Sequence, residues 1–480
     1  MTSSTQAGSA MVNVLADRYA SPLMTRIWSP RHRVVLERRF WVAVMDAQRA
    51  TGVDIPATAI EDYRRVIDEV DLDSIRRREL VTRHDVKARL EEFSALAGHE
   101  YAHVGLTSRD LTENVEQIQI VDALRLVRCD GVAVLLRLGA RAEEFADQPI
   151  AGRTHNAVAQ VTTLGKRFAN VAEELMSALE RLDTFLARLP MRGLKGPVGT
   201  QQDLLDLVGD PESVHRLELA VARHFGFERV MDSVGQVYPR SLDLDVVAVL
   251  TEITSALSDL ALQIRLMAGL EQVTEGFRPG QVGSSAMPHK MNTRSAERIN
   301  GLARVVRGHL TMAAGMAGDQ WNEGDVSCSV VRRVVLPDAF LATNAALHTS
   351  MAVLEDLGVF PRVIEAELDR YLPFLATTRF LVAAVRAGMG REEAHEVIKE
   401  HAVAVALEMR EGRATGGDLL DRLAADPRLP LTAAQLREAV ADPMALTGTA
   451  RNQIERITSR IEGWKVSEPD AVDVAAHMPL

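Results

Sequence analysis

The sequence contains few cysteines, few aromatic residues and no excess of positive charge. Its 480 residues include only Cys129 and Cys328, so no framework of disulfide bonds can hold the fold together. Lysine and arginine number 55 against 66 acidic residues, which gives a net charge of −11. Because nucleic-acid binders usually carry a strong basic excess, this balance argues against a nucleic-acid partner. It leaves room for a local basic pocket that binds a small anion.

Long apolar runs are also absent. Charged residues interrupt the apolar runs within about ten residues, whereas a helix that spans a bilayer needs about twenty. The N-terminal residues MTSSTQAGSAMVN contain no basic stretch followed by an apolar one, so they are not typical of a secretory signal. We therefore expect a cytoplasmic protein with no membrane contact.

The residues that are abundant favour helices. Aromatic residues make up only 4% of the chain, whereas alanine, leucine, arginine and glutamate are plentiful. Between Ser241 and Gln272, apolar residues recur with alternating steps of four and three. These residues form a heptad seam: Val246, Leu250, Ile253, Leu257, Leu260, Ile264 and Met267.

Four further segments show helical periodicity. They extend from Thr107 to about Phe145, from Val161 to Pro190, from about Ser295 to Met316 and from Leu336 to Leu357. Five long helices can bury their apolar stripes only against each other or against other subunits. The sequence therefore predicts an all-α protein built on a large bundle of long helices.

Shorter helices joined by turns precede and follow the long ones, and the chain is too long for one simple core. We therefore expect three domains. An N-terminal helical domain occupies residues 1–107, the central bundle occupies 108–362, and a small helical domain occupies 363–480. The last residues, VSEPDAVDVAAHMPL, are expected to form a loose tail.

Polar segments lie between the helices, where binding sites are expected. They comprise residues 83–85, 103–110, 152–156 and 280–292. Thr107 and Asp110 fit a capping box, and the hydroxyl and N–H groups at that helix start would also suit a carboxylate. His155 is either ordinary polar surface or a general acid or base. The residues alone leave both alternatives open.

One short motif indicates a different class of protein. Residues His99-Glu100-Tyr101-Ala102-His103 match the pattern that places two zinc ligands on one helix face. Such a site needs a third protein ligand, and Arg109 stands where the longer form of the motif has a histidine. A zinc protease is therefore kept as an alternative that metal analysis of the purified protein would test.

The most specific segment is GSSAMPHKMN at residues 283–292. It follows Gly276, Pro279 and Gly280, which favours a mobile loop, and it lacks the glycine spacing of a phosphate-binding P-loop. The segment resembles the signature loop of the fumarase/aspartase superfamily. Thr107-Ser108 and Gly152-Arg153-Thr154-His155 precede it in the order that is typical of this superfamily.

Within the superfamily, the sequence most resembles the adenylosuccinate lyase branch, over nearly the whole chain. The segments that carry this resemblance are Arg18-Tyr19, Arg83-His84-Asp85, Ser233-Val234-Gly235-Gln236, Trp321-Asn322-Glu323 and the Ala-Met-Pro-His of the loop. The resemblance implies a three-domain helical fold and a C–N bond cleavage by β-elimination. Members release fumarate from adenylosuccinate, giving AMP, and from the succinylocarboxamide ribotide of purine synthesis (SAICAR), giving AICAR.

This reaction requires a base for a weakly acidic Cβ proton, an acid for the departing nitrogen and groups that bind two carboxylates. By motif match, Ser284 is the expected base, His155 the expected acid, and Glu297 the carboxylate that orients His155. The resemblance assigns the nucleotide and succinyl groups to further residues: Arg18, Tyr19, Arg83, His84, Asp85, His103, Thr107, Ser108, Thr154, Gln236, Lys290, Asn292, Arg298, Ser329 and Arg333. No metal or organic cofactor is implied.

Some positions depart from the pattern of the family. Gly324 stands where many members have arginine on the nucleotide side, and Val330 stands where a serine is common. Arg332 or a residue of another subunit is expected to supply the missing charge. The departure keeps open a sister lyase that acts on another succinyl-amine or on a secondary-metabolite substrate.

The resemblance also implies a homotetramer whose active sites combine segments from three subunits. The heptad seam at residues 246–267 suits such an assembly. A further alternative is a non-catalytic helical assembly protein. The presence of Ser284, His155, Lys290 and Glu297 together argues against it, because a structural protein has no need to keep all four.

Overall fold

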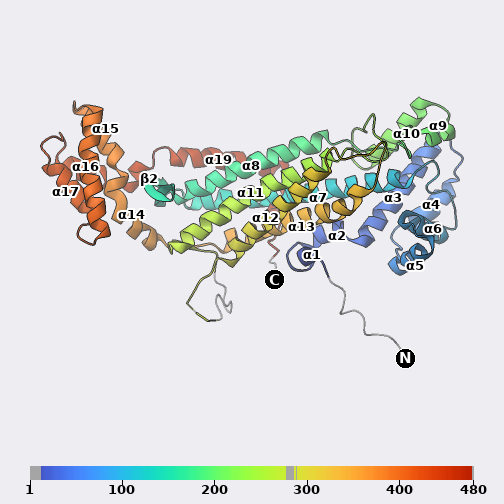
Figure 1. Cartoon of the computed structure of the whole chain (residues 1–480), viewed down its shortest axis with the longest axis horizontal. Coiled ribbons are helices and arrows are strands. Elements are labelled where there is room, and N and C mark those ends of the chain that lie inside the picture. The colour runs from blue at the N-terminus through green and yellow to red at the C-terminus, as the bar shows by residue number, and fades with distance from the viewer. Residues whose placement is uncertain (1–11, 277–285, 288, 478–480) are drawn as a thin grey trace.

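The molecule is elongated and mostly helical. The computed structural model describes residues 12–276, 286–287 and 289–477. Three groups of helices follow one another along the long axis (Figure 1). The N-terminal helices form one end, the long bundle occupies the middle, and α14 to α18 (residues 361–439) form the other end, whereas the last α-helix, α19 (Ala450–Ser467), lies along the bundle.

The long helices of the bundle carry the core. They are α7 (Ser108–Glu144), α8 (Leu164–Arg188), α11 (Ser241–Gly269), α12 (Arg294–Met316), α13 (Ser327–Asp356) and α19 (Ala450–Ser467). The seam residues between Val246 and Met267 are all buried, and α11 packs on α8, α12 and α13 of the same chain. The predicted helix bundle and its heptad seam are therefore confirmed. The seam packs against helices of the same chain.

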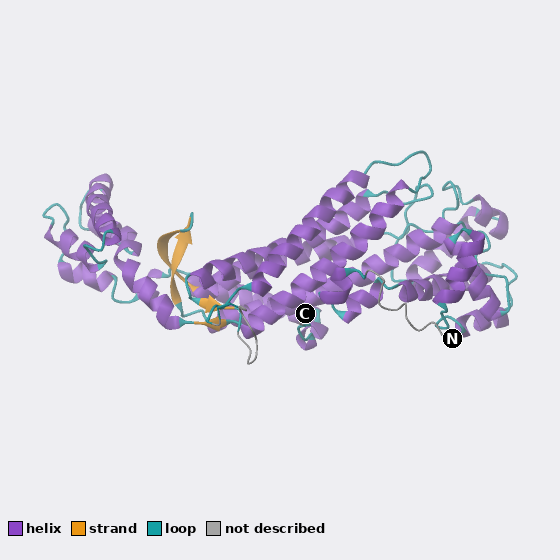
Figure 2. Ribbon diagram, turned by 60° about the horizontal axis from the view of Figure 1, so that its bottom comes forward, coloured by secondary structure: helices purple, strands orange, loops and turns teal. Residues whose placement is uncertain are grey.

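A β-hairpin replaces the start of the helix that we expected from Val161. Strand β1 (Pro149–Thr154) pairs with antiparallel β2 (Ala157–Thr163) and stands out from the helices in Figure 2. The β-branched residues of β2 suit a strand. Helix α8 begins only at Leu164, where Thr163 Oγ1 accepts a hydrogen bond from the N–H group of Lys166. The expectation for residues 161–163 was thus wrong.

Helix α13 begins at Ser327, nine residues before the expected start at Leu336, and continues through Pro337. Proline usually marks a helix boundary, since it lacks an N–H group and crowds the preceding turn. Here the turn before Pro337 is fixed by tertiary contacts, because Arg332 is buried and forms ion pairs with α7 and α11. These contacts hold the helix through the proline.

Shorter elements form the two ends. The N-terminal group comprises α1 (Val14–Arg18), α2 (Pro22–Ile27), α3 (Pro30–Ala50), α4 (Ala57–Arg65), α5 (Leu72–Thr82) and α6 (Asp85–Ala97), with α9 (Gln202–Val208) and α10 (Pro211–His224) against them. The C-terminal group has its own apolar core and comprises α14 (Pro361–Leu375), α15 (Thr377–Arg386), α16 (Arg391–Arg410), α17 (Gly417–Ala425), α18 (Ala433–Ala439) and η1 (Pro443–Leu446). Two short strands, β3 (Val273–Thr274) and β4 (Gly358–Val359), pair where the bundle meets this group.

The C-terminal tail is not loose over the described residues, contrary to expectation. Its short helix η2 (Pro469–Asp473) packs on α7 and buries Ala471. Arg137 donates a hydrogen bond to the carbonyl of Val474 (2.8 Å), and the N–H group of His477 donates to Nδ1 of buried His348 (3.0 Å). Specific polar contacts thus order the C-terminal segment, although its composition does not predict an ordered structure.

Helix α11 also corrects the expectation that no helix is apolar enough to span a membrane. Among the described residues, Ser241–Gly269 alone passes that test by length and composition, with a mean hydropathy of 1.4 over its best window. Yet 56% of this window is buried inside the chain, where α11 packs on three other helices. It is the core helix of a soluble protein.

Candidate active site

The predicted site residues lie at two opposite ends of the bundle. Ser108 begins α7, and the hairpin with His155 follows the other end of this 37-residue helix. At 1.5 Å per residue, α7 is about 55 Å long. We call these regions the Ser108 end and the hairpin end. No small substrate can contact both ends of one chain.

The Ser108 end gathers most of the residues expected to bind the nucleotide. Arg83 caps α5, His84 and Asp85 begin α6, and Ser329 and Arg333 lie in the first turns of α13. The ring nitrogen Nε2 of His84 lies 3.4 Å from Ser108 Oγ. A guanidinium nitrogen of Arg333 lies 3.9 Å from Asp85 Oδ2. The side chains of Arg83 and Arg333 are exposed.

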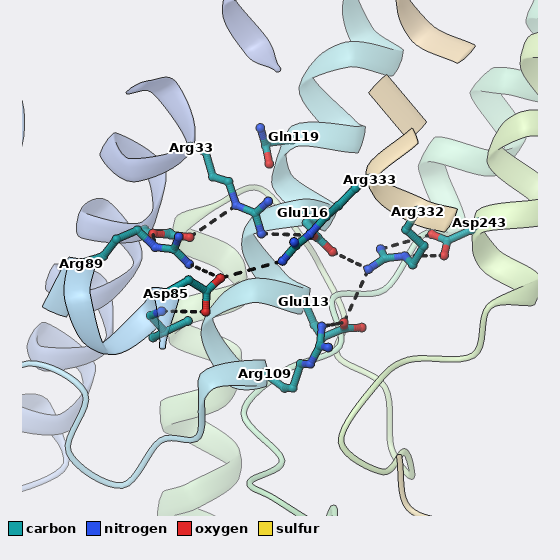
Figure 3. Close-up of polar contacts among 12 residues, drawn as sticks. Arg33, Asp85, Arg89, Arg109, Glu113, Glu116, Gln119, Asp243, Arg332 and Arg333 are labelled. Carbon is teal, nitrogen blue, oxygen red and sulfur yellow. Dashed lines mark hydrogen bonds and ion pairs between the residues drawn. The ribbon is translucent and has the colours of Figure 1, made fainter. Parts of the chain in front are cut away.

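A buried ionic network supports this end (Figure 3). Glu113 accepts hydrogen bonds from Arg240 (2.9 Å) and Arg109 (3.2 Å). Although burial alone would raise the pKa of Glu116, the guanidinium groups of Arg332 and Arg33 lower it to about 2. Glu116 thus stays ionised at neutral pH, and its ion pair with Arg332 fixes the start of α13 against α7.

Arg332 cannot supply the charge that Gly324 lacks. Its side chain is only 3% exposed, and its Nε donates to Asp243 Oδ2 (2.7 Å) while another nitrogen pairs with Glu116. A guanidinium group held by two buried carboxylates is not available to a ligand. The expectation that named Arg332 was therefore wrong.

The start of α7 is held by Asp110, as the capping box predicts. The Asp110 carboxylate accepts a hydrogen bond from the N–H group of Thr107 (2.8 Å). It also accepts from Arg192 (2.7 Å) and from the N–H groups of Lys195 (2.9 Å) and Gly196 (3.0 Å). Because Asp110 is fully buried, these four donors fix Thr107 and Ser108 relative to the loop at 192–196.

His103 is present as a neutral imidazole. The indole Nε1–H of Trp41 donates to His103 Nδ1 (3.0 Å), which leaves Nε2 to carry the proton. Burial lowers the pKa of His103, an effect that neighbouring Asp110 opposes only in part. His103 can therefore donate a hydrogen bond from Nε2 at neutral pH.

The zinc motif does not form a zinc site. Residues 99–105 lie outside any helix, so His99 and His103 do not share a helix face. His99 Nε2 instead lies 2.8 Å from Asp62 Oδ2. Among residues 12–276, 286–287 and 289–477, no three potential ligands of the His, Cys, Asp or Glu type cluster as a metal site would require.

His155 is at the tip of the β-hairpin. Thr154 pairs with Ala157, so His155 and Asn156 form a two-residue turn with φ values of +52° and +60°. Such turns need left-handed residues and usually contain glycine or asparagine. The side chains of Thr154 and His155 are exposed at the tip. The hairpin therefore presents His155 away from its own chain.

Residues 286–287 and 289–292 of the signature segment lie at the same end, and the expected base Ser284 falls outside the described residues. Lys290 and Glu297 are exposed, and Asn292 is half-buried. Sequence reasoning missed Glu275, whose carboxylate accepts hydrogen bonds from the N–H groups of Ser295 (2.9 Å) and Ala296 (3.0 Å). Glu275 thus caps the helix that carries Glu297. The available signal was an acidic residue just before a glycine-rich segment.

Arg18 and Tyr19 join this end of the bundle from the N-terminus. Tyr19 ends α1, and the guanidinium of Arg298 lies 5.4 Å from the centre of its ring. Arg298 is in the first turns of α12, one residue after Glu297. The structure therefore places Tyr19 beside Arg298 within one chain, at the opposite end of the bundle from Arg83, His84 and Asp85.

Comparisons with known proteins identify the family. The family described as "Lyase" matches residues 15–308, and that described as "Adenylosuccinate lyase C-terminus" matches residues 373–457. The chain is 34% identical to adenylosuccinate lyase of Saccharomyces cerevisiae over 457 residues, covering 93% of each chain. It is 33% identical to that of Methanothermobacter thermautotrophicus, covering 93% of this chain and 98% of the relative. The chain belongs to the adenylosuccinate lyase family.

As a member of this family, the chain is a carbon–nitrogen lyase. Solved structures confirm the fold. The lactonizing enzyme for 3-carboxy-cis,cis-muconate from Pseudomonas putida superimposes with a TM-score of 0.79 at 23% identity, covering 94% of this chain and all of that one. A fumarate lyase from Mesorhizobium sp. BNC1 gives the same TM-score and identity, over 92% of this chain and 98% of that one.

The geometry at Gly324 separates this adenylosuccinate lyase from the pattern expected of its family. A Cβ atom at Gly324 would lie 2.7 Å from Gln236 Cβ, closer than real Cβ atoms approach. The N–H group of Gln236 donates to the carbonyl of Glu323 (2.6 Å) and locks the two loops together. A cavity of about 650 Å³ adjoins this contact and is lined in part by Thr200 and Ser233.

Proposed function

We propose that this adenylosuccinate lyase releases fumarate by β-elimination from adenylosuccinate, giving AMP, and from SAICAR, giving AICAR. Ser284 removes the Cβ proton, His155 protonates the departing nitrogen, and Glu297 orients His155. The elimination requires only an acid, a base and anion-binding groups, and so needs no metal or organic cofactor. We also propose a cytoplasmic location, because the proposed substrates are soluble nucleotides.

Binding of the substrate is divided among the remaining residues. Lys290, Asn292, Thr107 and Ser108 bind the two carboxylates of the succinyl group. The nucleotide contacts come from Arg18, Tyr19, Arg83, His84, Asp85, Ser329 and Arg333. The other pocket residues, which contact the substrate through hydrogen bonds, are His103, Thr154, Gln236 and Arg298.

The observation that carries the proposal is the separation of these residues along the bundle. Acid and carboxylate-binding groups must lie within hydrogen-bond reach of one substrate, yet Ser108 and His155 flank a helix about 55 Å long. A complete site therefore combines the Ser108 end of one subunit with the hairpin end of another. We propose a homotetramer in which three subunits contribute to each site.

Exposed apolar residues on the bundle support this assembly. Leu262 and Leu266 of α11 and Leu270, which directly follows this helix, are between 41% and 49% exposed. Val305 and Met312, seven residues apart on the neighbouring α12, are also exposed. Soluble monomers rarely expose apolar stripes of this kind, whereas helices that pack between subunits require them.

The first test is fumarate release from adenylosuccinate by the purified protein, with Ser284→Ala and His155→Ala beside it. We expect turnover by the wild type and a loss of about 10²–10⁴-fold in each variant, because each removes one acid–base group. Full activity in either variant would contradict its assigned role. A tetrameric wild type that releases no fumarate from adenylosuccinate or SAICAR would contradict the proposed substrates.

The second candidate is a sister lyase that acts on another succinyl-amine. The close contact between Gly324 and Gln236 favours it, because an arginine cannot enter at this position without moving the loop at 233–236. Under the main proposal, Arg83 and Arg333 bind the phosphate group of the nucleotide in place of the missing arginine. Parallel assays with adenylosuccinate, its dephosphorylated nucleoside and other succinyl-amines distinguish the candidates.

A further inference from the structure

The hairpin that carries His155 rests on helix α14 of the C-terminal group. Ala151 of β1 and Val161 of β2 share one buried apolar cluster with Leu368 and Leu372 of α14. These apolar contacts fix the hairpin on α14, but they do not extend to the turn at its tip. The orientation of the turn must come from polar contacts above this cluster.

Glu367 of α14 forms the first of these polar contacts. Its carboxylate forms an ion pair with Arg153 of β1. Nη1 of Arg153 in turn donates a hydrogen bond to the carbonyl of Asn156 (3.0 Å). Because His155 and Asn156 both have positive φ, which costs non-glycine residues about 1 kcal/mol or more each, the turn needs such support. Glu367 thus fixes the turn through Arg153.

The same carboxylate also contacts the other side of the hairpin end. Gln272, which is buried, donates a hydrogen bond from Nε2 to the second oxygen of Glu367. Gln272 directly precedes β3, and Glu275 beyond this strand caps the helix that carries Glu297. The Glu367 side chain therefore connects the turn of His155 with the segment that caps the N-terminus of α12.

The local charges explain why a carboxylate is required at this position. Burial and the positive charge of Arg153 lower the pKa of Arg167, and only Glu367 opposes them. Two guanidinium groups therefore depend on one carboxylate that is 15% exposed. Without it, repulsion would drive Arg153 toward solvent and release the carbonyl of Asn156.

We propose that Glu367 is a positioning residue for catalysis, which holds Arg153 and thereby the turn that presents His155. The inference rests on the proposed role of His155 as general acid. Glu367 does not contact the substrate in this scheme. Its effect is transmitted through one ion pair and one hydrogen bond.

The test compares steady-state kinetics of the full-length Glu367→Gln and Arg153→Gln variants on adenylosuccinate. We expect kcat to fall by about 10- to 100-fold in each, since misplacement of a catalytic group by about 1 Å can cost about 10²-fold. The KM should stay within about threefold, because the anion-binding residues are unchanged. Glu365→Gln is the matched control, since Glu365 lies on the same helix and, among the residues that the structure describes, pairs only with exposed Arg362.

The double variant Arg153→Gln/Glu367→Gln separates positioning from general destabilisation. If both residues act through their ion pair, the double variant is no slower than the slower single variant. Arg153→Lys, which keeps the pair and loses the second donor, should be intermediate, and it also serves if Glu367→Gln does not fold. Losses that multiply in the double variant would contradict the proposal.

His155→Ala is measured in the same series. Wild-type kcat in Glu367→Gln together with an inactive His155→Ala would overturn the positioning role and leave the proposed function intact. Full activity in His155→Ala would instead overturn the acid assignment, and the positioning role with it. A kcat loss in Glu367→Gln with unchanged Glu365→Gln is the result we expect.

Discussion

At the scale of single residues, the proposed site contains backbone conformations that L-amino acids rarely adopt. Arg83, His103 and His155 have φ values of +52°, +71° and +52°. Each such conformation costs about 1 kcal/mol or more and persists only where the surroundings enforce it. The hydrogen bond from Trp41 stabilises this conformation at His103. The hydrogen bond from Arg153 to the carbonyl of Asn156 stabilises it at His155. Strain of this kind concentrates at functional sites.

His103→Asn tests the protonation state of His103. Asparagine tolerates positive φ, and its Oδ1 can accept the hydrogen bond from Trp41, but it has no equivalent of Nε2–H. Because burial lowers the pKa of folded His103 below 6.5, the unfolded chain binds this proton first. The wild type therefore loses stability as the pH falls through about 6.5, by at most about 1.4 kcal/mol for each pH unit.

We expect His103→Asn to lessen this pH dependence in urea unfolding at pH 7.5 and 5.5, and to raise the KM for substrate. Other buried histidines contribute equally to both proteins, so the difference between them isolates His103. An identical loss of stability in the variant would contradict a neutral, buried His103.

At the scale of elements, the capping of α12 by Glu275 determines how Glu297 is presented. Two hydrogen bonds from helix N–H groups to one buried carboxylate combine a cap with a favourable charge at the helix N-terminus. We expect Glu275→Gln to lose about 1–2 kcal/mol of stability and to lower kcat. Thermal unfolding and steady-state kinetics measure both effects.

Glu271→Gln is the control for this prediction, because Glu271 is exposed and lies four residues earlier in the same connection. An unchanged thermal midpoint in Glu275→Gln would contradict the capping role. Equal losses in the two variants would also contradict it.

The sequence predicted five of the bundle helices, all but α19, because their apolar residues repeat with a helical period. It did not predict the hairpin, because the turn at His155 and Asn156 lacks the Asn-Gly or Asp-Gly pair that marks a two-residue hairpin turn. It also placed the start of α13 next to Pro337, nine residues too late, because the true start depends on the ion pairs of Arg332. Contacts such as that of Glu367 with Arg153 join residues more than 200 positions apart, and no local pattern records them.

At the scale of the whole molecule, the same motifs predicted the chemistry but not its placement. The segments around Ser108 and His155 were recognised from their order along the chain, which carries no information on distance. Only the fold shows that α7 separates them by its full length (Figure 1). A shared site between subunits reconciles the family's chemistry with this separation.

Mixing two inactive variants tests the shared site most directly. His155→Ala and the double variant Thr107→Ala/Ser108→Ala should each be nearly inactive alone, since each damages every site. After subunit exchange at equal concentrations, about a quarter of the sites would combine an intact Ser108 end with an intact hairpin end from different chains. We predict that fumarate release from adenylosuccinate returns to about a quarter of the wild-type rate. Mixed tetramers that remain inactive would contradict a site assembled from different subunits.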